Sequence, residues 1–548
     1  MDTLLLPFSP RYIVLTICAS ATALLLILGV YDRKILDLVL IPLLIFGALT
    51  LLGVRDLLQS SHAVLRNYPI SAHLRFLLEE IRPEMRQYFF ESEKDGMPFS
   101  RDTRAVVYQR AKMVLDKRPF GTQEDVYREG YEWMHHSVAP KPRAEEKYRI
   151  TIGGPDCAKP YSASVFNISA MSFGALSPNA VRALNGGAKR GGFAHDTGEG
   201  GFSPYHAEMG GDIIWEIGSG YFGCRHRDGS FDPDAFARVA ATEQIKMVEL
   251  KVSQGAKPGH GGVLPAAKVS EEISKIRGVA MGEDCISPPA HRAFSTPIGM
   301  MQFIGEMRRL SGGKPAGFKL CIGHPWEWFA MVKAMLETGI TPDFIVVDGA
   351  EGGTGAAPLE FTNNVGAPLQ EGLLLVHNTL VGLNLRDQIK IGCAGKVTTA
   401  FDIVRLMALG ADWCNAARGF MFALGCIQAQ ACHTGHCPTG VTTQDPQRQR
   451  AIVVPDKAQR VANFNQGTLK ALKELVEAAG LCHPQEITAQ HIVHRLDKHE
   501  VRLLANLLPF VEPGAVLRGE LPHNTFRVYW PLASAHSFSP QGRIERAA

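Results

Sequence analysis

The sequence predicts an α/β protein whose main domain is a (β/α)8 barrel, the TIM-barrel architecture. From about residue 164, short apolar runs alternate with helix-length amphipathic stretches, which is the pattern of parallel βα units. Glycine-rich or polar loops follow the apolar runs, and this is where a barrel carries its reactive groups. The chain has 548 residues, so a domain of this kind leaves room for further segments.

Eight apolar runs can be assigned to barrel strands, and eight parallel strands close a barrel. They span residues 164–169, 192–196, 213–218, 247–252, 317–322, 343–349, 389–395 and 411–417. A doubly wound sheet is the alternative. It would need one dominant G-x-G-x-x-G at the first strand turn, and the sequence has no such fingerprint in that context.

The loops after these runs supply candidate binding residues. Backbone amides of glycine-rich loops can hold a phosphate, a common use of the late-strand loops of these barrels. The candidates for cofactor contacts are Ala170, Met171 and Ser172 after the first run, Gly352, Gly353, Thr354 and Gly355 after the sixth, and Gly392 and Gly395 at the seventh.

A group of charged and amide side chains lies at the end of the fourth run. Lys251, Gln254 and Lys257 follow one another at a spacing of three, so two cations and an amide donor meet at one barrel mouth, where they could hold a dicarboxylate. A solvated basic loop is the structural alternative. Glu199, in the sequence TGEGG, adds a carboxylate suited to proton transfer or to pairing with a substrate ammonium.

Lys319 is a lysine inside the otherwise apolar fifth run. We expect it to point into the barrel, where a cation can stabilise negative charge on a reduced flavin ring. A buried ion pair with Asp348 is the structural alternative.

Three cysteines form the pattern C-x5-C-x4-C shortly after the last run: Cys426, Cys432 and Cys437. Thiolates this close together are commonly metal ligands, and three cysteines without an obvious fourth suggest a three-iron cluster. His433 and His436 leave a zinc site open, and three unrelated buried thiols remain the structural alternative.

The N-terminus predicts a membrane anchor. Residues 12–30 and 35–53 contain one charged residue between them, Asp37, and each could form a helix about 28 Å long, enough to cross a membrane. A signal peptide followed by a core helix is the alternative. Arg55, Arg66, Arg75 and Arg82 after the second span favour an inner-membrane protein whose catalytic domain is cytoplasmic.

We therefore expect four parts: a two-span transmembrane hairpin (1–54), a helical connector packed onto the barrel (55–145), the barrel with its cysteine loop (146–480) and a C-terminal extension (481–548). The formal net charge of +3 and the lack of a dense Lys/Arg run make a nucleic-acid partner improbable. The 11 cysteines form no disulfide framework and indicate a reducing compartment.

Over roughly residues 145–480 the chain resembles the FMN-binding synthase domain of glutamate synthases. Its N-terminal hairpin and connector resemble those of the stand-alone bacterial proteins of that family. The resemblance rests on SAMSFGALS (169–177), DTGEGG (196–201), LKVSQGAKPGHGG (250–262), ISPPAH (286–291), EGGTGAAP (351–358) and GCIQAQACHTGHCPTGV (425–441), all in family order.

The resemblance implies FMN over the barrel mouth, with Gln254 and Lys319 among its contacts, and a [3Fe-4S] cluster on the three cysteines. It also implies 2-oxoglutarate held by Glu199, Lys251, Gln254 and Lys257, with Glu199 or Lys257 handling protons. Electrons would pass from the cluster to the flavin, and the expected reaction is reductive amination to L-glutamate.

Departures from the family limit this expectation. The chain begins with Met1-Asp2 instead of a catalytic cysteine, so we expect no glutaminase activity of its own, and nitrogen could come from a separate glutaminase. No nicotinamide-binding domain is visible, so a ferredoxin or an NAD(P)H-oxidising subunit should supply electrons. Two other functions stay open: a synthase that uses an amine to form an N-substituted glutamate, and a membrane-anchored flavin and iron-sulfur electron-transfer module.

Overall fold

A computed structural model describes residues 6–141 and 148–542 and divides after Asp102 into two compact units. The first unit contains a 3-10 turn η1 (Leu6–Phe8), the helices α1 (Ile13–Tyr31) and α2 (Leu36–Leu58), the short turn η2 (Arg33–Ile35) that joins them, α3 (Ala63–Asn67), α4 (Ser71–Met85) and a π-helical turn η3 (Arg86–Phe90).

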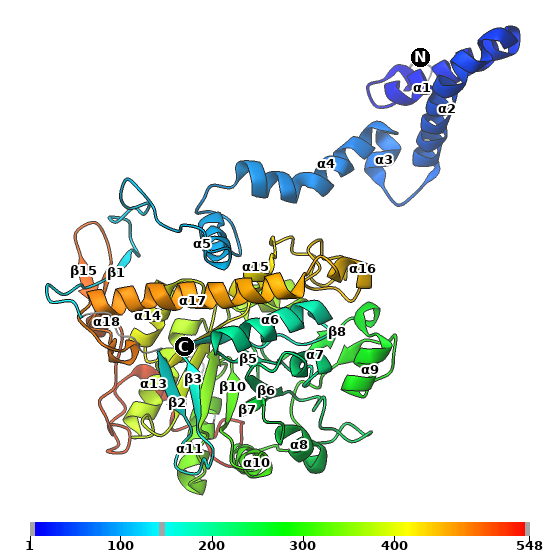
Figure 1. The fold of residues 1–548 in the computed structure, drawn as a ribbon. Coiled ribbons are helices and arrows are strands. Elements are labelled where there is room, and N and C mark those ends of the chain that lie inside the picture. The colour runs from blue at the N-terminus through cyan, green and yellow to red at the C-terminus, as the bar shows by residue number, and fades with distance from the viewer. Residues whose placement is uncertain (1–5, 142–147, 543–548) are drawn as a thin grey trace. The chain divides into compact units, whose positions relative to one another are not determined.

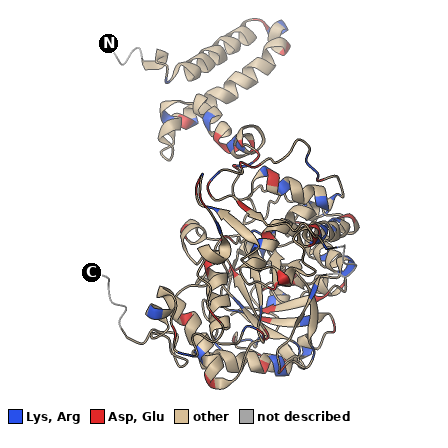
Figure 2. Cartoon of the chain, turned by 90° about the vertical axis from the view of Figure 1, so that its left-hand side faces the viewer, with Lys and Arg blue, Asp and Glu red and all other residues tan. Residues whose placement is uncertain are grey.

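Helices α1 and α2 pack against each other as a hairpin. The hydroxyl groups of Thr22 and Thr50 lie 3.0 Å apart between them. Both helices are long and apolar enough to cross a membrane, and Figure 2 shows almost no Lys, Arg, Asp or Glu along their middle parts. Two apolar helices were predicted here and are confirmed; that they span a membrane remains a proposal.

The second unit is built on a closed barrel of eight parallel strands, in the order β10-β11-β12-β13-β4-β5-β6-β7 (Figure 1). The predicted barrel is thereby confirmed, and each of the eight predicted runs overlaps one strand of the barrel. In chain order the strands are β4 (Phe166–Ile168), β5 (His195–Asp196), β6 (Ile213–Ile217), β7 (Ile245–Lys251), β10 (Ala316–Leu320), β11 (Phe344–Asp348), β12 (Lys390–Ala394) and β13 (Trp413–Ala416).

Helices surround the barrel, and the apolar core lies between them and the strands. The helices are α6 (Pro178–Gly191), α7 (Pro204–Ala207), α8 (Pro233–Ala240), α9 (Glu271–Arg277), α10 (Pro297–Leu310), α11 (Pro325–Thr338), α12 (Leu359–Asn364), α13 (Leu369–Gly382), α14 (Ala400–Ala408), α15 (Arg418–Leu424), α16 (Pro446–Gln449), α17 (Val454–Ala478), α18 (Leu504–Leu507) and α19 (Asn524–Tyr529), with the 3-10 turns η4 (Ala266–Lys268) and η5 (Pro484–Glu486).

Helix α6 illustrates how the sequence sets an element and its packing. The Ser177 side chain caps its first turn by accepting from the Ala180 amide, Pro178 occupies the first turn, and Gly192 ends the helix with φ 70°. A Cβ on Gly187 would lie 2.3 Å from the Val461 side chain, so glycine is what allows α17 to lie this close along α6.

Small sheets lie outside the barrel, and one of them joins segments that are distant in the chain. Strand β1 (Glu132–Met134) pairs with β14 (Ile492–Arg495), which pairs with β15 (Val501–Leu503). The other two are the hairpins of β2 (Arg149–Ile152) with β3 (Tyr161–Ser164), and of β8 (Val263–Leu264) with β9 (Cys285–Ile286).

The predicted connector 55–145 is divided between the two units. Helices α3 and α4 belong to the first unit, whereas β1 and most of α5 (Arg101–Ala111) belong to the second. Within the second unit α5 is tied to α17, because the Asn463 amide donates to the Ala111 carbonyl at 3.0 Å. The β1–β14 pairing likewise links this segment to the C-terminal extension.

Candidate active site

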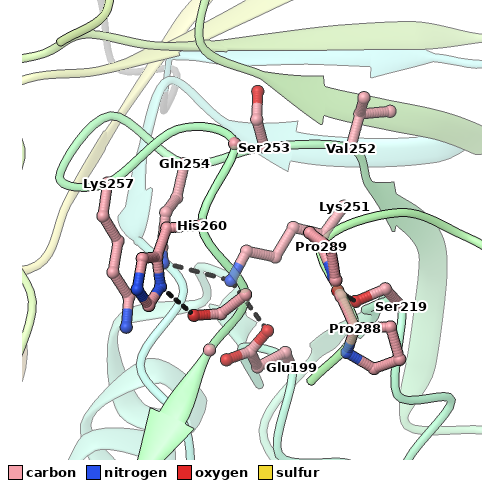
Figure 3. Close-up of a pocket in the computed structure, with 13 residues that line it drawn as sticks. Glu199, Ser219, Lys251, Val252, Ser253, Gln254, Lys257, His260, Pro288 and Pro289 are labelled. Atoms are coloured by element: carbon pink, nitrogen blue, oxygen red, sulfur yellow. Dashed lines mark hydrogen bonds and ion pairs between the residues drawn. The ribbon is translucent and has the colours of Figure 1, made fainter. Parts of the chain in front are cut away.

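A pocket lies at the carboxyl ends of strands β5, β6 and β7, the face on which TIM barrels carry their active sites. Figure 3 shows its lining, which brings together all four predicted substrate residues: Glu199, Lys251, Gln254 and Lys257. The other labelled lining residues are Ser219, Val252, Ser253, His260, Pro288 and Pro289. The four predicted substrate residues therefore line one pocket.

Lys251 and Glu199 form an ion pair at the centre of the pocket. The Lys251 Nζ lies 2.9 Å from Glu199 Oε2 and donates to Gln254 Oε1 at 3.3 Å (Figure 3). Burial acts to raise the pKa of the Glu199 carboxyl, but Lys251, with smaller contributions from Arg277 and Lys257, outweighs it, so the pKa lies below its usual value. Glu199 is therefore ionised near neutral pH.

Two glycines determine where the Glu199 side chain can lie. A Cβ on Gly262 would stand 1.8 Å from Glu199 Oε1, and a Cβ on Gly218 would stand 2.8 Å from the Glu199 Cβ. Glu199 itself follows Gly198, which has φ 65° and whose Cβ would meet the Ser172 amide at 2.7 Å. The loops after β4 and β5 thus press together and fix this carboxylate.

Lys257 is a buried cation without a protein partner. Its residue is 3% exposed, and within the part of the chain that the structure describes its ammonium forms no hydrogen bond or ion pair. Burial lowers the pKa of Lys257, and the Glu199 charge partly opposes this. A buried ammonium with free donors can bind an anion or release a proton.

His291 contacts the backbone of Lys251, a residue that lines the pocket, and this contact was not predicted from the sequence. Its Nε2 lies 2.8 Å from the Lys251 carbonyl and its Nδ1 lies 3.1 Å from the Tyr221 hydroxyl. Burial lowers the pKa of His291 to about 4, so the ring is neutral and holds the end of β7 through hydrogen bonds. It lies in the predicted motif ISPPAH, which was a signal for the family but not for this contact.

The barrel interior below the pocket holds a buried charged cluster. Lys319 pairs with Glu216, and its Nζ lies 3.7 Å from Glu249 Oε1. Asp348, which we expected as the alternative partner, instead accepts from the Gly255 amide at 2.8 Å. Burial and the neighbouring Glu216 raise the pKa of Asp196 to about 7. The predicted inward orientation of Lys319 agrees with these contacts.

The glycine loop after β11 has the properties of a phosphate site. A Cβ on Gly355 would meet no protein atom within 4 Å, so a ligand can approach this backbone. Arg418, at the start of α15, donates to the Thr354 carbonyl at 3.0 Å and brings a cation to the loop. These residues fit the phosphate of a flavin mononucleotide. Arg418 was missed, although its position directly after β13 could have indicated it.

The other predicted loop positions differ in environment. Gly392 lies within β12, where a Cβ would meet the Trp413 ring at 2.3 Å, so its small size serves packing of the barrel wall. Gly395 lies just past the strand, against Leu369. Met171, together with Ser172, borders the Glu199 loop at Gly198. Ala170 follows Ser169 in the chain, and the Ser169 backbone N–H donates to the Ala416 carbonyl of β13.

The cysteine loop follows α15 and presents three free thiols: Cys426, Cys432 and Cys437. Burial raises the pKa of Cys426 to about 11, with negative charge on Cys432 and Cys437 contributing. Burial acts to raise the pKa of Cys437 as well, but hydrogen bonds from Thr439 and Thr442 lower it to about 7. Cys432 and Cys437 therefore lie close enough to Cys426 to affect its pKa.

The donor set of the cysteine loop has the chemistry of an iron-sulfur site. Its three free thiols are the ligand type that iron-sulfur clusters use. Among the described residues, the three ligand atoms that lie within 4.8 Å of one another belong to Asp196, Glu216 and Glu249, and the cysteine sulfurs are not in that group.

Each cysteine of the loop, or its backbone carbonyl, has a contact that helps to fix its place. The Tyr108 hydroxyl on α5 donates to the Cys426 carbonyl at 2.6 Å, and the Lys268 ammonium on η4 donates to the Cys432 carbonyl at 2.6 Å. Cys437 Sγ lies 3.5 Å from the Thr439 hydroxyl. Sequence spacing found the cysteines, but neither Tyr108 nor Lys268, since both are distant in the chain.

Comparison with known proteins identifies the family to which the sequence is similar. A family model described as a conserved region in glutamate synthase matches residues 124–482. The glutamate synthase large subunit-like protein YerD of Bacillus subtilis (strain 168) is 38% identical over 515 residues, which cover 86% of this chain and 97% of that protein. The archaeal-type glutamate synthase (NADPH) of Thermotoga neapolitana is 32% identical over 340 residues, covering 61% of this chain and 64% of that protein.

Proposed function

The chain belongs to the glutamate synthase family of oxidoreductases, and on that premise we propose that it carries out the reductive amination of 2-oxoglutarate to L-glutamate. The observation that carries the proposal is the pocket in which Lys251, Gln254 and Lys257 surround the Glu199 carboxylate. In the balanced reaction, 2-oxoglutarate, ammonium, two electrons and two protons give L-glutamate and water.

The two lysines are the residues that bind the substrate carboxylates. Lys257 has free donors and meets a carboxylate directly, whereas Lys251 is already bonded to Glu199 and Gln254 and can share its remaining donor. A dicarboxylate needs two cationic contacts to be fixed at both ends. On this proposal a keto diacid should be favoured over a keto acid with an apolar side chain.

Glu199 and Lys257 have different roles around the proton transfer. The lowered pKa of Glu199 keeps it ionised, so it orients an incoming ammonia or stabilises a cationic imine. The lowered pKa of Lys257 makes this ammonium the better acid, and it can protonate the keto oxygen that leaves as water. We therefore assign the proton-donating role to Lys257.

We propose that the barrel mouth binds FMN. Arg418 and the loop Gly352–Gly355 would hold its phosphate, and Lys319 would face its ring from inside the barrel. Ala170, Met171, Ser172 and Gln254 lie on the loops that border the same mouth. FMN, when bound, supplies the hydride that reduces the imine carbon.

We propose that Cys426, Cys432 and Cys437 hold a [3Fe-4S] cluster. The three anchors described above keep the loop in place, and the lowered pKa of Cys437 favours the thiolate that iron requires. Such a cluster, when bound, supplies electrons one at a time. The electron donor would be a ferredoxin or an NAD(P)H-oxidising subunit, and a separate glutaminase could provide ammonia.

We propose that α1 and α2 anchor the protein in the inner membrane as a two-span hairpin. Both helices have a mean hydropathy of 2.6 over their most apolar window, and few of the residues in that window are buried by protein. The arginines after α2 favour a cytoplasmic catalytic unit.

The proposal is tested by reoxidation of the reduced protein. Full-length protein reduced anaerobically with dithionite should be reoxidised by 2-oxoglutarate together with ammonium, and not by either alone. Lys257→Met should abolish the reoxidation by weakening keto-acid binding, whereas Lys275→Met, an exposed lysine on α9, should leave it unchanged. Equal reoxidation of the wild type and Lys257→Met would argue against this pocket as the active site.

A further inference from the structure

Lys268 is a buried cation directed at the cysteine loop. Its residue is 4% exposed, and its Nζ donates to the Cys432 carbonyl at 2.6 Å and to the Thr442 carbonyl at 3.1 Å. The donor comes from η4, in the long excursion between β7 and β10. It thus reaches the loop from a segment 164 residues earlier in the chain.

The charge of Lys268 lacks a protein carboxylate. In the ranges 6–141 and 148–542, no Asp or Glu oxygen lies within 4.0 Å of its Nζ. A buried ammonium is costly unless negative charge compensates it. Burial lowers the pKa of the Lys268 ammonium, and negative charge on Cys432 and Cys437, two of the three candidate iron ligands, opposes that shift.

We propose that Lys268 is the counter-charge of the metal cluster on the cysteine loop and sets its reduction potential. This inference rests on the proposed function, which places a cluster at Cys426, Cys432 and Cys437. A fixed positive charge stabilises the reduced, more negative form of a nearby redox centre, so it raises the midpoint potential. Lys268 is then a tuning residue: it contacts the loop backbone and acts on the metal through charge.

Two variants of the full-length protein separate charge from anchoring. Lys268→Met removes the charge and the hydrogen bonds but keeps most of the side-chain volume, and Lys268→Arg keeps the charge. The matched control is Lys314→Met, because Lys314 is also buried and also donates to two backbone carbonyls, those of Ala240 and Thr242, which lie outside the cysteine loop.

The midpoint potential of the cluster is measured by an anaerobic redox titration followed by electron paramagnetic resonance, with iron content as a second reading. Lys268→Met should shift the ratio of reduced to oxidised cluster at a given potential by roughly tenfold toward the oxidised form, equal to 59 mV for one electron. Lys268→Arg and Lys314→Met should stay at the wild-type potential.

An unchanged potential in a Lys268→Met protein that retains its cluster would overturn the inference and leave the proposed function intact. Loss of the cluster in Lys268→Met but not in Lys268→Arg would support a required positive charge, and loss in both would overturn the role of charge. Wild-type protein without iron or a cluster signal would overturn the proposed cluster itself.

Discussion

The Lys251 ammonium lies 2.9 Å from the Glu199 carboxylate, and the two residues come from the ends of different barrel strands, β7 and β5. Because both side chains are largely buried, the pair is a fixed feature of the pocket. Its geometry depends on close contacts with glycines, which gives a direct way to disturb it.

Gly262→Ala should disable the site without unfolding the protein. The added Cβ would lie 1.8 Å from Glu199 Oε1, the flexible end of that side chain, so the carboxylate must move away from its place beside Lys251. We expect glutamate formation to fall roughly 100-fold, as for other misplaced catalytic groups, with a change in unfolding free energy of about 1 kcal/mol or less.

The control for this variant is Gly305→Ala on α10, where the Cβ would meet Ile340 at an ordinary 3.5 Å. Steady-state turnover and thermal unfolding of both proteins are compared. Full turnover by Gly262→Ala would show that the position of Glu199 does not matter to the reaction.

Cys432→Ser should remove the metal cluster. A serine hydroxyl is a poor iron ligand, and the remaining two thiols cannot complete the site. Iron content and the visible absorption of the cluster should drop to background. The matched control is Cys482→Ser, which replaces an exposed free thiol outside the loop. Equal iron in both variants would mean that Cys432 is not a ligand.

His195 should make the barrel sensitive to acid. Burial lowers the pKa of His195 to about 3, well below its unfolded value of about 6.5. A group whose folded pKa is depressed in this way favours the native state when neutral, and the stability is lost as pH falls below 6.5. Between pH 6.5 and 5 the loss amounts to about 2 kcal/mol.

His195→Phe cannot be protonated, so its Tm should fall less between pH 7 and pH 5 than the wild-type Tm does. His206 packs against His195 with ring centroids 5.1 Å apart, and its pKa is also lowered by burial, so some sensitivity should remain. Identical pH profiles would contradict the assignment.

The hairpin should place the full-length protein in the membrane fraction until detergent is added. Leu24→Arg combined with Leu44→Arg puts a charge into each helix at positions that the protein leaves exposed, at a cost of about 3 kcal/mol per residue in a bilayer. This variant should disappear from the membrane fraction, whereas Leu517→Arg, on the surface of the barrel unit, should not. Wild-type protein that is soluble without detergent would disprove the anchor.

The barrel and much of its pocket could be predicted because the evidence is local. Each strand is a short apolar run. Residues at or directly after the ends of parallel strands meet at one end of the barrel, so the sequence predicted that Glu199 and Lys251 lie at the same end. The contacts that could not be predicted cross long stretches of chain: Lys268 reaches Cys432, and Tyr108 reaches Cys426. Loop spacing carries no information about such pairs.

The partner of Lys319 was missed for a related reason. Asp348 is on the strand next to Lys319 and was the natural candidate, but strand register is not visible in a single sequence. The register of β6 and β7 places Glu216 opposite Glu249, and the interior of the closed barrel brings both to Lys319. The pairing of β1 with β14, which divides the expected connector, is equally non-local.

The most direct test of the central claim follows the nitrogen atom. Full-length protein containing its flavin and cluster is reduced anaerobically and mixed with 2-oxoglutarate and ammonium labelled with nitrogen-15, and the product is analysed by mass spectrometry. We predict labelled L-glutamate in an amount that matches the two-electron equivalents consumed. Consumption of those electrons without labelled glutamate, or a different amino acid formed when an amine is supplied, would contradict the assignment of this protein as a glutamate-forming enzyme.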